Sequence, residues 1–111
     1  MVQGYLKAIP VNVIQDVNGI YKIGFVQPAG DGQSSAEMWQ LVAPRLSETE
    51  ARQLSDVIEA SALGAKLFYS VTIDFRMTNG KMGAKITYLY PELGASKYLE
   101  NLKDQDVEEA R

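Results

Sequence analysis

The sequence of 111 residues contains no cysteine and no histidine. Without cysteine the chain forms no disulfide bond, offers no thiolate nucleophile and builds no zinc ribbon. Without histidine it has neither a Ser–His catalytic pair nor an ordinary transition-metal site. We therefore expect a protein that is not an enzyme and that holds no cofactor.

Long apolar runs are also lacking. No stretch approaches the roughly 20 apolar residues that span a bilayer, and the first residues lack the apolar region of a signal peptide. We expect a soluble, cytoplasmic protein. The composition, 46% hydrophobic and 23% charged, is that of an ordinary globular chain of one domain. We place that domain at residues 1–91 and expect an acidic tail at residues 92–111.

Alternating apolar and polar residues predict strands in the first part of the chain. These strands are expected at residues 2–15, 20–27 and 37–42. Turn residues at 16–19 join the first two strands into a hairpin, and the glycines and serines of residues 30–35 indicate a loop. Pro10 interrupts the first strand, so it must lie at an edge, a bend or a bulge. A helix remains the alternative for residues 37–42.

Ser47 and Glu50 have the spacing of a capping box, which predicts a helix over residues 48–62. Apolar residues recur at helical spacing through this segment, and Gly64 follows where a helix-ending glycine is common.

A second hairpin follows the helix. Residues 67–77 and 82–90 alternate in polarity, and Asn79-Gly80 between them is typical of a tight hairpin turn. Four aromatic residues follow the apolar alternation and are expected in the core: Tyr69, Phe75, Tyr88 and Tyr90. The tail after this hairpin is expected to hold a short helix at residues 96–102.

The predicted order is three strands, one helix and two strands, which is the order of the OB barrel. In that barrel the first strand bends to pair on both sides, and Pro10 or Gly4 could supply the bend. The alternative is an open antiparallel sheet with the helix packed on one face.

The net charge of −3 is unevenly distributed. Residues 64–91 carry a net charge of +3, whereas residues 37–63 and 92–111 carry −3 each and residues 1–36 are neutral. A chain that is acidic in total can therefore present a basic sheet.

Aromatic residues accompany the basic ones, and Phe68 shares the polar alternation of the strand that follows it. Stacking of bases on aromatic rings beside lysine and arginine is how single-stranded nucleic acid is held without sequence preference. We expect phosphate contacts from Lys7, Lys22, Arg76, Lys81 and Lys85. We expect base stacking on Tyr5, Trp39 and Phe68.

The element order, the basic hairpin after the helix and the acidic tail together resemble the small OB-fold single-stranded DNA-binding proteins of phages and plasmids. The resemblance covers residues 2–91 and implies a role in DNA replication, a dimer or higher oligomer, and a tail that recruits partners. The tail of this chain ends in Arg111 rather than in an apolar tip, and its body is less basic than is usual in that family.

A protein-binding module or inhibitor is the alternative function. A short acidic protein without catalytic residues suits docking of its helix and tail on a basic partner.

Overall fold

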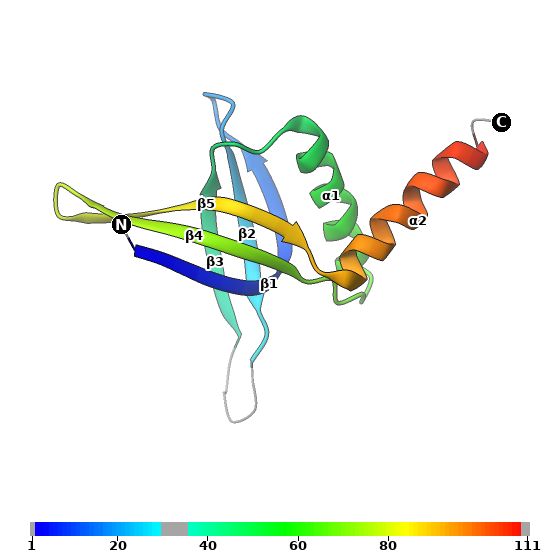
Figure 1. Ribbon diagram of the computed structural model, residues 1–111, viewed down its shortest axis with the longest axis horizontal. Helices are drawn as coiled ribbons and strands as arrows, with labels where there is room; N and C mark the ends of the chain where they lie inside the picture. Colours follow the sequence, from blue (N-terminus) through cyan, green and yellow to red (C-terminus); the bar gives the residue numbers. More distant parts are fainter. Residues whose placement is uncertain (1, 30–35, 110–111) are drawn as a thin grey trace.

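The computed structural model describes residues 2–29 and 36–109. Its first six elements follow the predicted order, and a helix longer than the one predicted at residues 96–102 follows them (Figure 1). They are β1 (Val2–Gln15), β2 (Tyr21–Gln27), β3 (Glu37–Ala43), α1 (Glu48–Ala62), β4 (Tyr69–Thr78), β5 (Lys81–Pro91) and α2 (Leu93–Glu109). The third segment is a strand, so the helical alternative for it is wrong. The loop predicted over residues 30–35 lies outside the described residues.

The five strands close into a barrel in the order β1-β2-β3-β5-β4. All neighbouring strands are antiparallel except β3 and β5, which pair in parallel where Val42 lies opposite Lys85. The OB-like barrel predicted from the element order is confirmed, and the open sheet is wrong. Closure leaves β1 hydrogen-bonded to both β2 and β4.

β1 serves both neighbours because it bends at a bulge. Residues 2–8 pair with β4 and residues 9–15 pair with β2, with a register shift between Pro10 and Asn12. The Asn12 side chain accepts a hydrogen bond from the Gly24 amide at 3.0 Å, which fastens the bulge to β2. Pro10 thus lies at the bend, as its missing N–H requires.

Gly4 is not the site of the bend in β1, which lies at Pro10. A Cβ built on Gly4 would lie 2.6 Å from Cε2 of Phe75, so the glycine leaves room for that ring beside β1.

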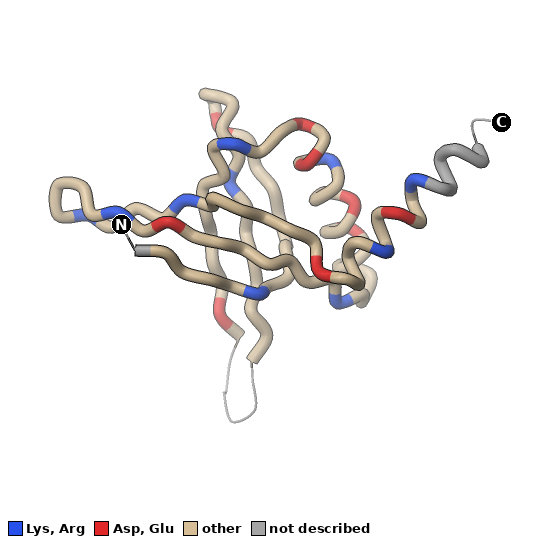
Figure 2. Tube along the Cα trace, viewed as in Figure 1, with Lys and Arg blue, Asp and Glu red and all other residues tan. Residues whose placement is uncertain are grey.

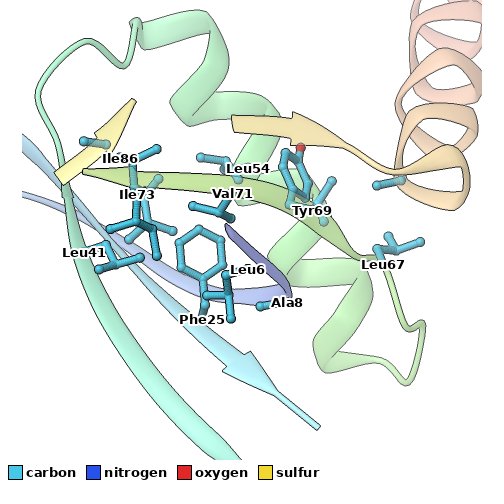
Figure 3. Packing of buried hydrophobic residues seen from close by; sticks show 14 of the residues in the cluster. Leu6, Ala8, Phe25, Leu41, Leu54, Leu67, Tyr69, Val71, Ile73 and Ile86 are labelled. Atoms are coloured by element: carbon cyan, nitrogen blue, oxygen red, sulfur yellow. The ribbon is translucent and has the colours of Figure 1, made fainter. Parts of the chain in front are cut away.

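The core fills the barrel and continues under α1 (Figure 3). Ser47 and Glu50 form the predicted capping box at the start of α1. Leu54 and Val57 of this helix are almost completely buried, and they pack with the strand residues Phe25 and Val71. Because apolar residues of both layers share one cluster, α1 covers one end of the barrel.

α2 extends well beyond the short helix predicted for residues 96–102. Its first turns join the core through Ala95, which is fully buried, and through the partly buried Tyr98 and Leu99. The rest of α2 points away from the barrel (Figure 1). Within the described ranges, neither helix has the length and apolar character needed to cross a membrane.

The β4–β5 hairpin projects from the opposite side of the barrel to α2 (Figure 1). Asn79 and Gly80 form its turn with positive φ angles of 52° and 75°. Positive φ at both central residues matches the tight hairpin turn predicted from Asn-Gly.

Candidate nucleic-acid interface

A bulge in β5 decides which aromatic residues face outward. Ile73 of β4 lies opposite Ile86, but the preceding residue, Thr72, lies opposite Tyr88, so Thr87 is the extra residue. An extra residue reverses the alternation of every side chain after it. Leu89 therefore faces the core, and Tyr88 and Tyr90 are 58% and 60% exposed. The prediction that these two tyrosines belong to the core is wrong.

The outward tyrosines come together across three strands. Cross-strand pairing places Tyr5 of β1, Thr72 of β4 and Tyr88 of β5 in one row. The next row holds Lys7, Ser70 and Tyr90. We call the surface formed by Tyr5, Lys7, Tyr88 and Tyr90 the tyrosine face. It is exposed throughout and combines aromatic rings with a cation.

Tyr5 is held in place on this face by hydrogen bonds. Its hydroxyl donates to Ser70 Oγ at 2.9 Å, and Ser70 Oγ donates to a carboxylate oxygen of Glu92. The Glu92 amide in turn donates to the carbonyl of Phe68 at 2.9 Å. This chain of bonds connects β1 and β4 with Glu92, the residue after β5, and it orients the Tyr5 side chain.

Phe68 lies at the border of the tyrosine face. The Lys7 ammonium nitrogen lies 5.5 Å from the centroid of its ring, within the range of a cation–π interaction. Phe68 is only partly exposed, so its visible contact is with Lys7. The strand predicted to begin at residue 67 begins at Tyr69, so Phe68 precedes β4, where its ring lies beside the Lys7 cation of the tyrosine face.

A cleft of about 420 Å³ adjoins the tyrosine face at Tyr88. Arg45, Arg76 and Lys85 line it, and Asp74 is the one carboxylate among the described residues of its lining. We call this the basic cleft. Its volume lies in the range of about 300–1,000 Å³ that is usual for ligand sites. Figure 2 shows basic residues along the β4–β5 hairpin and mostly acidic residues along α1.

Asp74 holds one of these cations loosely. A carboxylate oxygen lies 3.8 Å from Nε of Arg76, and the aspartate side chain is only 12% exposed. Its other oxygen has no hydrogen-bond partner among the described residues. This weak ion pair is the one that Arg76 makes within the described ranges, and it leaves the guanidinium mostly available to bind an anion.

The remaining predicted site residues lie elsewhere. Lys22 is exposed on β2. It pairs with Val42 of β3, which in turn pairs with Lys85 of β5, so one strand separates Lys22 from Lys85. Lys81 lies at the end of the hairpin. Trp39 lies opposite Phe25 and packs against the core, with its indole nitrogen buried and unpaired within the described part of the chain. Trp39 is therefore not on the tyrosine face.

Arg45, Tyr88 and Tyr90 are the site residues that sequence reasoning missed. Leu89 was the sequence signal that Tyr88 and Tyr90 face outward. It is an aliphatic residue at a position that the simple alternation assigns to the polar face of the strand. Arg45 comes close to Lys85 only because β3 and β5 pair in parallel at Val42, a contact that barrel closure creates.

Among the residues that the structure describes, no three acidic side chains gather where they could hold a metal ion. No protein-family model matches the sequence, and a search of curated proteins found no match. The fold and the surface chemistry are therefore the basis for assigning a function.

Proposed function

We propose that this protein is a non-enzymatic binder of single-stranded DNA, which the tyrosine face and the basic cleft hold together. The stacked, exposed pair Tyr88 and Tyr90 beside the basic cleft is the observation that carries the proposal. Unpaired bases stack on aromatic rings, and each stacked base contributes about 1–3 kcal/mol. The bases of a duplex are already stacked and paired, so this surface favours single strands.

The phosphates would be contacted by four cations around the rings: Lys7, Arg45, Arg76 and Lys85. Lys7 is part of the tyrosine face, and the other three line the basic cleft. Rings flanked by cations suit a strand whose bases turn toward the protein while its backbone follows the positive charge. A protein with this ligand would work in the cytoplasm wherever single strands are exposed, as in DNA replication.

The alternative of a module that docks by negative charge has less support. A groove of about 320 Å³ separates α1 from α2, and it is the natural place for a partner of the two helices. Its lining contains Arg52 and Lys103 as well as Asp56 and Glu100. Counted over the described residues, this lining holds two basic and two acidic side chains, which do not make the negative surface that charge mimicry requires.

Titration of a fluorescent oligo(dT) at two salt concentrations tests the proposal. Four phosphate contacts on a single strand give a slope of about −2.8 for log K against log salt, which weakens binding about 50-fold between 50 and 200 mM salt. Unlabelled oligo(rU) and a DNA duplex serve as competitors. Absence of binding at micromolar protein and low salt would contradict the proposal, as would a duplex that binds as tightly as the single strand.

A further inference from the structure

The β4–β5 hairpin continues beyond the barrel as a two-stranded ribbon. The last described pair between β1 and β4 joins Val2 to Phe75, so residues 76–83 project past the neighbouring strand (Figure 1). We call residues 76–83 the ribbon. Because it has left the barrel, neither of its faces is covered by another strand of the described chain.

The two faces of the ribbon differ in chemistry. Met77 and Met82 lie directly opposite each other and are 65% and 68% exposed. They follow the alternation of the core residues Ile73 and Ile86, so they extend the apolar side of the hairpin beyond the barrel. Burial does not explain these two apolar side chains, because they bury little of their surface.

The other face of the ribbon is basic and continuous with the basic cleft. A second cleft of about 290 Å³ shares Asp74, Arg76 and Lys85 with the basic cleft and adds Lys81 of the ribbon. A DNA strand bound at Tyr88 can therefore continue along these cations to the end of the hairpin. Met82 also lines this second cleft, so the apolar and basic faces meet there.

We propose that the ribbon is inserted at the junction between single-stranded and double-stranded DNA and opens the duplex. This inference rests on the proposed function, since the separated strand must be held by the tyrosine face and the basic cleft. One of the separated DNA strands follows the basic face of the ribbon toward Tyr88. Met77 and Met82, on the opposite face, pack against the terminal base pair.

Each part of this arrangement has a physical reason. A two-stranded ribbon is narrow enough to enter a groove of duplex DNA. Methionine is among the apolar side chains that proteins insert between base steps to unstack them, and its flexible, polarizable thioether adapts to aromatic surfaces. The cations Arg76 and Lys81 on the same ribbon complement the phosphates at the fork. A second copy of this chain is the other possible occupant of the methionine pair, and the experiment below distinguishes the two.

A forked duplex tests the inference directly. The probe is a short DNA stem with an oligo(dT) arm, carrying a fluorophore and a quencher at the first base pair, so that opening raises the fluorescence. The variant M77S/M82S removes the apolar side chains at exposed positions and is expected to fold. The matched control is M38S, because Met38 is 70% exposed but lies on β3.

We expect wild type and M38S to open the fork equally and M77S/M82S to open it at least about tenfold less, since the energy of unstacking a base step is no longer compensated. The affinity of M77S/M82S for oligo(dT) is measured separately, and opening is compared at protein concentrations that saturate the oligo(dT) arm. A change in affinity through Met82, which lines the second cleft, then does not count as lost opening.

Three results would overturn the inference. Equal opening by wild type and M77S/M82S would remove the role of the methionines. If M77S/M82S changed its oligomeric state in sedimentation but still opened the fork, Met77 and Met82 would be assigned to contact with a second copy of the chain. Tight oligo(dT) binding by wild type without fork opening would overturn the inference but leave the proposed function standing. Failure of wild type to bind oligo(dT) would instead remove the proposed function on which the inference rests.

Discussion

The rings of Tyr88 and Tyr90 lie nearly parallel on the outer surface of β5, with centroids 6.1 Å apart and 11° between their planes. Residues two apart on a strand share a face, and this pair shares the outer one because Thr87 is an extra residue in the strand. Two large apolar rings exposed beside cations suit a ligand that has both π faces and negative charge. Single-stranded nucleic acid has both.

The salt dependence of binding should reveal which cations contact phosphate. R76A/K85A removes two cations of the basic cleft, so the slope of log K against log salt should become about 1.4 less steep. K66A/K97A is the matched control, since both of these lysines are exposed and neither lies at the cleft. Equal slopes for the two double variants would show that the cleft does not hold the backbone.

Truncation of the acidic end should strengthen binding. Deleting residues 104–111 removes four carboxylates and one arginine while keeping Ala95 and the core contacts of α2. Less negative charge repels the phosphates less, so oligo(dT) affinity should rise at low salt, and the gain should fade near 0.15 M, where screening acts within about 8 Å. Weaker binding after truncation would mean that this end of α2 is part of the site.

The capping box at α1 gives a prediction about stability alone. S47A removes the side chain that accepts a hydrogen bond from the Glu50 amide, which should lower the free energy of unfolding by about 1 kcal/mol. S61A is the control, because Ser61 Oγ is buried with no hydrogen-bond partner within the described residues. Urea unfolding measures both variants, and oligo(dT) affinity should not change in either. An equal loss in S61A would contradict the role of the cap.

Alkaline pH should destabilise the fold through Tyr69. Burial, with a smaller effect of the negative Glu50, raises the pKa of Tyr69 from 10.0 to about 12. Below pH 10 the tyrosine is neutral in both states; above it the unfolded chain loses the proton first, so stability should fall as pH rises from 10 toward 12. Y69F cannot ionise and should show a smaller fall in urea unfolding over that range. Identical pH profiles for the two proteins would contradict this assignment.

Local patterns predicted much of the fold. Each of four features depends on residues close together in the sequence: the order of elements along the chain, the capping box of Ser47 and Glu50, the Asn79-Gly80 turn and the bend at Pro10. Their geometry follows from backbone rules that apply before any tertiary contact forms. The closed barrel then followed from the order of elements.

The site was harder to predict because it depends on register. The alternation places Tyr88 and Tyr90 inside, and one bulge at Thr87 moves both outside. Trp39 is the opposite case, a residue expected on the binding surface that packs inside. The sequence predicts base stacking on this tryptophan. Its partner Phe25 lies in the core, and Trp39 packs against that core too. Pairing registers across the barrel depend on tertiary contacts, and the aliphatic Leu89 was the one local sign of this register change.

The most direct test of the account compares Y88A/Y90A with Y88F/Y90F in an oligo(dT) titration. Alanine removes two stacking surfaces, so the dissociation constant of Y88A/Y90A should rise at least about 30-fold. Phenylalanine keeps the rings and should bind within about twofold of wild type. Circular dichroism would show that both variants fold. Unchanged binding by Y88A/Y90A, or an equal loss in Y88F/Y90F, would contradict the claim that these rings hold the bases.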